Sequence, residues 1–186
     1  MANVDAGFGF RPVSADGGPY TGQTERVVIL SGDGTALYIG SPVKITTTAA
    51  ATDGSPSVIV AAAGSPVYGV VTSFEANPDN LSLQYRAATT KRFANVVRAD
   101  NAFFEVQAKA NPGLASVNQN IALVITGGSA FTGQSGDEIV TPTVATSGDC
   151  KIIRGVNRPD NDLTLSNSVW IVKFNNTTQS DGTLGT

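Results

Sequence analysis

Two copies of Pro-Asp-Asn, at residues 78–80 and 159–161, are the first feature of this chain that could do chemistry. Each places an aspartate, Asp79 or Asp160, where it could act as a catalytic acid or bind a cation, and Asp162 follows the second copy. A Ca²⁺ site takes about six to eight oxygen ligands, however, and no EF-hand-like spacing surrounds Asp160 and Asp162. Proline instead fixes φ at one corner of a turn, and asparagine readily takes the left-handed conformation beside it. The two copies therefore predict two turns.

Glutamates are the other candidates, because two carboxylates about 5–10 Å apart can hydrolyse a glycosidic bond. Those outside obvious turns or at strand margins are Glu25, Glu75, Glu105 and Glu138. Nothing in the sequence brings two of them together, and we expect all four to be solvated. The chain has no histidine, which removes Ser-His-Asp and Cys-His catalysis and histidine metal sites. No phosphate-binding glycine motif is present either. We therefore expect no enzyme, no catalytic residue, no cofactor and no metal.

Composition narrows the range of partners. The net charge of −3 argues against a nucleic-acid binder held by phosphate neutralisation. No run of 18 apolar residues is present, so we expect no membrane span, and the N-terminal sequence indicates no secretory signal. The single cysteine, Cys150, fits a reducing cytoplasm and is expected to be a small buried hydrophobe. Charged residues are only 15% of the chain, which suits a surface that lies against other protein.

The candidate residues named above lie on or between short apolar or alternating runs, which are separated by turn-forming residues. The runs cover residues 26–30, 36–40, 42–46, 57–63, 66–74, 92–99, 102–108, 120–125, 151–156 and 168–174. This spacing predicts an all-β domain over residues 24–175, either a β-sandwich or a β-barrel. Within the last run, Trp170 shares a face with Val172 and Phe174, which indicates packing in the core.

The two ends of the chain differ from this middle. Residues 1–23 are rich in glycine and lack a long strand run, and residues 176–186 are polar. We expect an extended N-terminal arm and a polar C-terminal tail. The arm carries several rings, which favours docking on a neighbouring molecule over packing into its own domain. The candidate partner-binding residues are Phe8, Phe10, Arg11, Pro12 and Tyr20.

Several stretches taken together resemble one family, the capsid decoration or cement proteins of tailed bacteriophages. The stretches are AGFGFRPV, GGPYTGQTERVVIL, TALYIGSPVKI, GVVTSFEANPDN, FFEVQ, GVNRPDNDL and VWIVKFNN. The resemblance implies a β-sandwich, often jelly-roll-like, that is made in the host cytoplasm and lies on the outer surface of the capsid. It implies the major capsid protein as the partner, and it implies no catalytic residue.

We therefore expect a non-enzymatic virion structural protein that stabilises the head by bridging neighbouring major capsid subunits, through contacts repeated many times. Self-association is expected as well, with a homotrimer favoured over a dimer. One alternative is a head-fibre or tail-associated module that recognises a host-surface glycan, which predicts an exposed aromatic platform near Asn and Asp. A second alternative is a free-standing β-barrel domain of a cellular protein, which predicts ordered termini and needs no partner.

Overall fold

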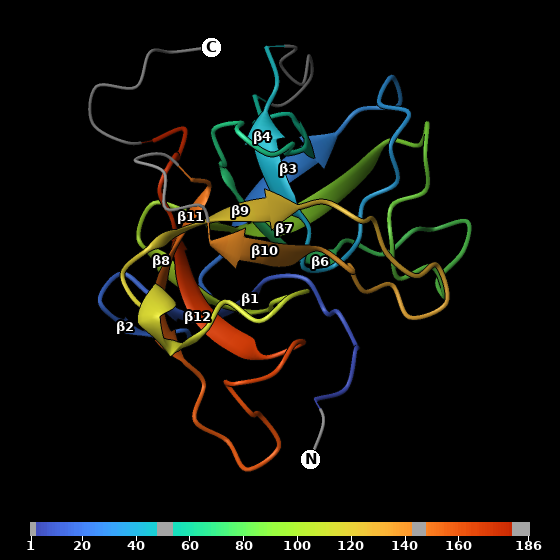
Figure 1. Cartoon of the computed structure of the whole chain (residues 1–186). Coiled ribbons are helices and arrows are strands. Elements are labelled where there is room, and N and C mark those ends of the chain that lie inside the picture. Colours follow the sequence, from blue (N-terminus) through green and yellow to red (C-terminus); the bar gives the residue numbers. More distant parts are fainter. Residues whose placement is uncertain (1–2, 48–53, 143–147, 180–186) are drawn as a thin grey trace.

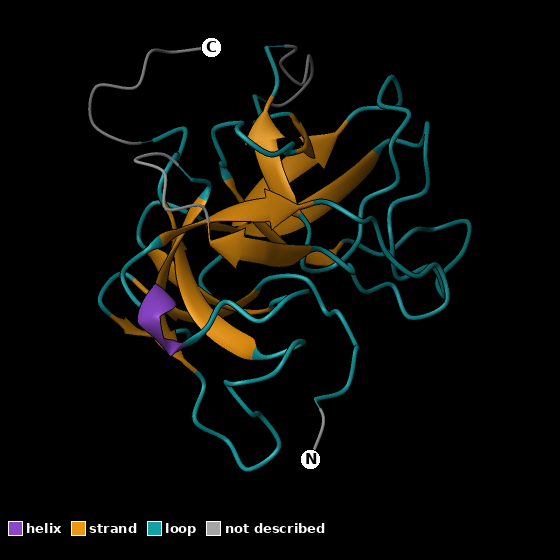
Figure 2. Ribbon diagram, in the orientation of Figure 1, coloured by secondary structure: helices purple, strands orange, loops and turns teal. Residues whose placement is uncertain are grey.

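Two antiparallel β-sheets pack as a sandwich in the computed structural model, which describes residues 3–47, 54–142 and 148–179 (Figures 1 and 2). The strands are β1 (Arg11–Ala15), β2 (Gly18–Pro19), β3 (Glu25–Ile29), β4 (Pro42–Ile45), β5 (Val58–Val60), β6 (Gly69–Phe74), β7 (Arg92–Arg98), β8 (Ala102–Gln107), β9 (Asn120–Val124), β10 (Glu138–Pro142), β11 (Cys150–Gly155) and β12 (Val169–Phe174). One sheet has the order β10-β9-β11-β12-β8-β1-β2, and the other has the order β3-β7-β6-β4-β5. The β-sandwich predicted from the sequence is confirmed.

Helix is limited to one short 3₁₀ turn, η1 (Leu114–Ser116), within the ranges given above. It lies at the lower left of Figure 2. In those same ranges no helix is both long and apolar enough to cross a membrane.

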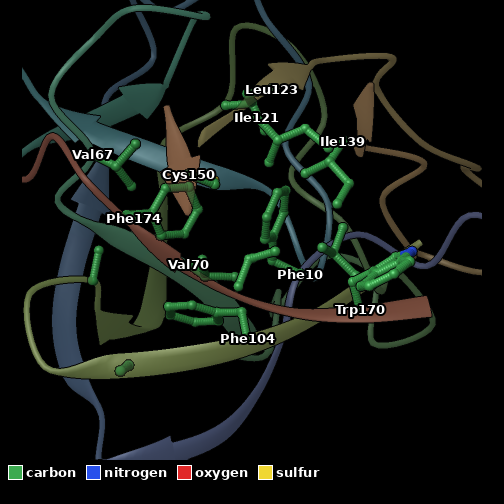
Figure 3. Packing of buried hydrophobic residues seen from close by; sticks show 14 of the residues in the cluster. Phe10, Val67, Val70, Phe104, Ile121, Leu123, Ile139, Cys150, Trp170 and Phe174 are labelled. Carbon is green, nitrogen blue, oxygen red and sulfur yellow. The ribbon is translucent and has the colours of Figure 1, made fainter. Parts of the chain in front are cut away.

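The main core lies between the sheets and follows the alternation of the strands. In β8, Ala102, Phe104 and Val106 are fully buried, whereas Phe103 and Glu105 between them are partly exposed. Trp170 belongs to the same core together with Val172 and Phe174, as its spacing predicted, and its indole Nε1 donates to Ser168 Oγ at 2.9 Å. Figure 3 shows Trp170 and Phe174 within this core.

Cys150 is also a buried member of this core, as predicted. Burial raises the pKa of its thiol well above the usual range, because the thiolate would lose its hydration. Cys150 is therefore an inert packing residue.

A second apolar cluster fills the concave side of the five-stranded sheet. This sheet curls until its edge strands β3 and β5 approach, where Val28 bridges Ser57 and the Val28 N–H donates to the Pro56 carbonyl at 2.9 Å. The enclosed side chains are Val27, Ile29, Leu37, Val43, Val58, Tyr68, Val71, Ala94 and Val96. Since β6 contributes Val70 to one cluster and Val71 to the other, both faces of this sheet are buried.

The prediction of an N-terminal arm that extends away from the domain is wrong for its described residues. Within the predicted arm, β1 pairs with β8 and β2 completes a hairpin with β1. Before β1, the Asn3 side chain donates to the Asp162 carbonyl at 2.8 Å, and the Phe10 N–H donates to the Gly40 carbonyl at 2.9 Å. The segment packs on its own domain because Phe10 fills the main core, where it is 1% exposed.

The polar C-terminal tail begins with residues that also contact the domain. Thr177 is buried and bridges Val67, whose N–H donates to the Asn176 carbonyl at 2.9 Å. The rest of the predicted tail, residues 180–186, lies outside the described residues.

Candidate functional site

Both Pro-Asp-Asn copies form the same turn. In the first copy, the Asn80 N–H donates to the Asn77 carbonyl at 3.1 Å, and in the second the Asn161 N–H donates to the Arg158 carbonyl at 3.1 Å. The Asn77 side chain adds a further bond by accepting from the Asp79 N–H at 3.0 Å. The prediction of two turns is confirmed.

The role predicted for the asparagines is wrong, because neither Asn80 nor Asn161 has a positive φ. Asn161 instead joins the two strands on either side of its turn. Its side-chain amide donates to the carbonyls of Val156 and Val169 at 2.7 and 3.0 Å, and its oxygen accepts from the Val169 N–H at 2.8 Å. The second turn is thus fastened by a buried asparagine that a local sequence pattern does not reveal.

The aspartates beside the second turn have protein partners. Asp160 lies 3.6 Å from the guanidinium of Arg158, which also donates to Glu105 at 2.7 Å. Asp162 accepts from the N–H and the hydroxyl of Thr164 at 2.9 and 2.6 Å, and these bonds lower the pKa of its carboxyl. Within the described ranges, no group of three or more His, Cys, Asp or Glu residues could hold a metal ion.

Replacing either turn aspartate by asparagine is expected to change the free energy of unfolding by less than about 1 kcal/mol, because asparagine serves the same turn chemistry. The lost Asp160–Arg158 pair adds little, since Asp160 is 79% exposed and exposed pairs are weak. Urea unfolding of Asp79→Asn and Asp160→Asn measures this directly.

Asn161→Ala is the contrasting variant in the same turn. It leaves the Val156 and Val169 groups without their partner, so we expect a loss of about 1–3 kcal/mol. Equal effects of Asp160→Asn and Asn161→Ala, or a metal-dependent melting temperature, would contradict the turn assignment.

The four candidate glutamates lie on different elements and have different partners. Glu75 accepts from Arg26 Nε at 2.5 Å, and Glu105 pairs with Arg158. Glu25 lies against the Tyr68 hydroxyl, where burial first and then Glu25 raise the pKa of the tyrosine. Glu138 is only 7% exposed, so the expectation that all four are solvated is wrong.

Glu138 and its neighbour Asp137 are buried carboxylates at the start of β10. Burial raises the pKa of both groups. For Glu138 the carboxylates of Asp5 and Asp137 raise the pKa further, and Lys109 opposes them. Asp137 Oδ1 accepts from the backbone of Thr126 at 2.8 Å, which partly offsets the effect of its burial.

These raised pKa values predict that stability falls as the pH rises. A carboxyl whose pKa is higher in the folded than in the unfolded state stabilises the fold below its unfolded pKa, and this contribution is lost as the pH rises through the folded pKa. Glu138→Gln removes one such group, so the variant should gain stability relative to the parent chain between pH 4 and pH 8. Chemical unfolding at several pH values tests this, and a gain that is the same at pH 4 and pH 8 would contradict it.

The five predicted partner-binding residues line one groove between the two sheets, which we call the β1–β6 groove. Phe8, Phe10, Arg11, Pro12 and Tyr20 form its N-terminal side, and Ile39, Gly40, Val71, Thr72 and Gln134 complete it. The groove has a volume of about 270 Å³. Arg11 lies over the Phe8 ring at 4.5 Å and forms part of the rim.

Phe10 needs a correction, because it is not available to a partner. Its ring packs against Phe174 and Phe104 at centroid distances of 5.1 and 6.4 Å, so it forms the floor of the groove and part of the core. Phe8, Pro12 and Tyr20 remain partly exposed, and Arg11 is exposed. The sequence grouped these residues as candidates for binding a partner, but it did not show that Phe10 packs into the core of its own domain.

Three loops meet at one end of the sandwich, which we call the loop end: residues 30–41, 75–91 and 126–136. They extend to the right in Figure 1. The first loop contacts both others, since Tyr38 stacks on Tyr85 at 5.2 Å and Ile39 bridges Gln134.

Two large apolar side chains protrude from the loop end. Phe131 is 95% exposed, and Leu81 is 80% exposed. Neither was among the predicted site residues. A signal was present for Phe131, because it is the only large apolar residue in the otherwise Gly-, Ser- and Thr-rich stretch at 126–136.

Two arginines hold the loop end in place. The guanidinium of Arg86 is fully buried and donates to the backbone carbonyls of Leu30, Asp33, Thr35 and Thr90 at 2.5–2.8 Å. Arg92 is also buried and donates to the carbonyls of Glu75, Leu83 and Tyr85. These bonds fix the 30–41 and 75–91 loops, the second of which carries Leu81. The 126–136 loop with Phe131 is held by backbone bonds to Ile39, whose N–H donates to the Gly133 carbonyl at 2.9 Å and whose carbonyl accepts from the Ser135 N–H at 2.8 Å.

The sheet edges offer little for the addition of a strand from another molecule. On one edge of the larger sheet, strand β2 has only two residues, one of which is Pro19. On the other edge, the Ile139 carbonyl of β10 already accepts a bond from the Lys109 N–H at 2.9 Å. The edge strands of the smaller sheet meet each other through Val28 and Ser57. Such edges resist pairing with a strand of another molecule, so we expect contacts with other proteins to be made by side chains and loops.

Comparison of this chain with protein-family models, with curated proteins and with solved structures finds no match.

Proposed function

We propose that this chain is a non-enzymatic structural protein of a tailed-phage virion, bound to the outer surface of the capsid. It stabilises the head by bridging neighbouring major capsid subunits, and it is made in the host cytoplasm. The sequence resemblance described above is one support. The second support is that the described part of the chain has fixed loops and that the chain has few charged residues.

The observation that carries the proposal is the exposed pair Phe131 and Leu81 on a rigid loop end. Burying such side chains contributes roughly 1.5–3 kcal/mol each. Little is spent on ordering the loops, because Arg86 and Arg92 already hold the loop of Leu81 and backbone bonds to Ile39 hold the loop of Phe131. Aromatic residues at the centre of a contact, with few charges around them, are typical of protein–protein interfaces. Each such contact is weak, but a shell repeats it many times.

Copies of the chain also contact each other on the shell in this proposal. A trimer at threefold positions is the arrangement expected from the resemblance, and a dimer at twofold positions is the alternative. Neither nucleic acid nor a membrane is a partner in this account, and the net charge of −3 is consistent with that.

A glycan-binding module is the second candidate, and one observation favours it. Phe131 is an exposed aromatic ring, and the adjacent 75–91 loop carries Asn77, Asp79 and Asn80. The side-chain oxygens of both asparagines are already used within the loop, where they accept from the N–H groups of Asp79 and Ser82 at 3.0 and 3.1 Å. This use leaves fewer groups to recognise a sugar, so the capsid partner is the better-supported one.

Co-sedimentation with heads that were assembled without this chain tests the proposal. The parent chain should sediment with the heads, and Phe131→Ser with Leu81→Ser should lose most of that binding because both apolar contacts are removed. Leu114→Ser is the matched control: Leu114 is 59% exposed on η1, away from the loop end in Figures 1 and 2.

The control variant should bind heads as well as the parent chain does. Binding of the double variant at the parent level would contradict the role of the loop end. Binding to host cell-surface glycans, with none to heads, would favour the second candidate.

A further inference from the structure

We propose that Phe131 of one copy inserts into the β1–β6 groove of a second copy, and that the second copy returns the same contact. This inference rests on the proposed function and specifies the self-association within it: an inserted Phe131 contacts the neighbouring copy, and Leu81 at the same loop end is left to contact the capsid. Its test uses the purified chain alone. It can therefore fail without affecting the binding to heads.

The inserting group is well defined. Phe131 lies at the tip of a hairpin that is closed by backbone bonds, from the Ser129 N–H to the Gln134 carbonyl at 3.0 Å and from the Gly133 N–H to the Ser129 carbonyl at 2.8 Å. The stretch 126–136 carries no charged residue. Inserting its tip therefore removes no ion from water, and the loop is already ordered before it binds.

The receiving groove suits an aromatic ring. Its volume is about 270 Å³, and a cavity of roughly 150 Å³ is enough to hold benzene. Phe8, Pro12 and Tyr20 give it apolar walls, and none of its lining residues is acidic. Arg11 at the rim, already placed over Phe8, could also contact the face of an incoming ring.

Phe131 cannot fill the groove of its own molecule while its loop keeps its present contacts. The Ile39 N–H donates to the Gly133 carbonyl at 2.9 Å, and Gly133 packs closely against Gln84. These contacts hold the tip out in solvent, where Phe131 is 95% exposed. A second copy is the available source of a matching surface.

The relative position of the two features favours a twofold contact. Gln134, three residues from Phe131, lines the groove of its own molecule, so the protruding ring and the groove adjoin on one surface. Two copies related by a twofold axis then exchange rings reciprocally, as an isologous interface requires. The resulting unit is a dimer, which is the alternative to the trimer.

The contact is expected to be weak in solution. A Phe side chain buries about 150–250 Å², so two rings fall well short of the roughly 1,200 Å² of a stable interface. We expect a dissociation constant between about 1 µM and 1 mM, because the area is small and the loops are rigid. On a shell that already holds many copies close together, such a contact is strengthened by the high local concentration.

Sedimentation equilibrium of the purified chain up to about 1 mM tests the inference. The parent chain and Leu114→Ser should associate to dimers. Phe131→Ser should stay monomeric, as should Thr72→Trp, which fills the groove from the β6 side. Gln134→Trp offers a second way to fill the groove at an exposed side chain, should Thr72→Trp melt at a lower temperature than the parent chain.

A monomeric parent chain over the whole range would overturn the inference. Undiminished association of Phe131→Ser would overturn it as well, and so would undiminished association of a folded variant with a filled groove. A trimer that depends on both Phe131 and the groove would retain the insertion but overturn the twofold arrangement.

Discussion

Phe10→Ala is expected to lower the free energy of unfolding by about 3–5 kcal/mol, because it removes a large ring from a tightly packed core. Phe10 is 1% exposed and contacts the rings of Phe104 and Phe174, which come from the paired strands β8 and β12. Alanine keeps the backbone bond from residue 10 to the Gly40 carbonyl, so the loss reports the ring alone. Urea unfolding measured by tryptophan fluorescence reports the change.

Phe8→Ala is the matched control for this prediction. Phe8 is two residues away and partly exposed, so its loss should cost less than half as much as that of Phe10. If Phe10→Ala unfolds at the same urea concentration as the parent chain, the N-terminal segment is not part of the core and behaves as the free arm that the sequence suggested.

Arg86→Met should destabilise the chain by about 3–5 kcal/mol, which is the usual effect of removing one side of a buried ionic network. The substitution removes a charged donor from four backbone carbonyls of two loops. The Leu30 and Asp33 carbonyls keep the backbone donors of Asp33 and Thr89, whereas those of Thr35 and Thr90 lose the Arg86 guanidinium as their donor, which is costly. Burial also lowers the pKa of Arg86, and Asp33 at 3.5 Å opposes this shift. Hydrogen exchange should show the loops at 30–36 and 86–90 opening first.

Arg154→Met removes an exposed arginine from β11 and serves as the control, with an expected change within about 0.5 kcal/mol. Similar effects of the two substitutions would contradict the structural role assigned to Arg86.

The strands of the domain could be predicted because their signal is local. Alternation in β8 identifies its buried face, and Pro-Asp-Asn identifies the turns, since each depends on neighbours within a few residues. The placement of Trp170 in the core follows from the face that it shares with Val172 and Phe174. The overall class of fold then follows from the number and spacing of the strands.

The N-terminal segment could not be placed in this way. Its glycines and short runs hide a strand whose partner, β8, lies about ninety residues further along the chain. A ring in such a segment has the same local pattern whether it binds a neighbouring molecule or its own core. Only the pairing of Arg11 with Glu105, and the contacts of Phe10, decide between them.

The role of the candidate partner-binding residues stays a prediction. Phe8, Arg11, Pro12 and Tyr20 lie along one groove, whose opposite side comes from Val71 and Thr72 on β6 and from Ile39 in the 30–41 loop. The loop end escaped prediction because Arg86 and Arg92 organise two of its loops through backbone carbonyls and Ile39 holds the third through its own backbone, and such bonds have no sequence signature.

The most direct measurement of the central proposal is the temperature at which heads lacking this chain release their DNA, with and without the added purified chain. The account predicts that the chain raises this temperature, and that Phe131→Ser with Leu81→Ser raises it much less while Leu114→Ser matches the parent. An unchanged release temperature, at concentrations where the chain saturates the heads, would contradict a role in stabilising the capsid.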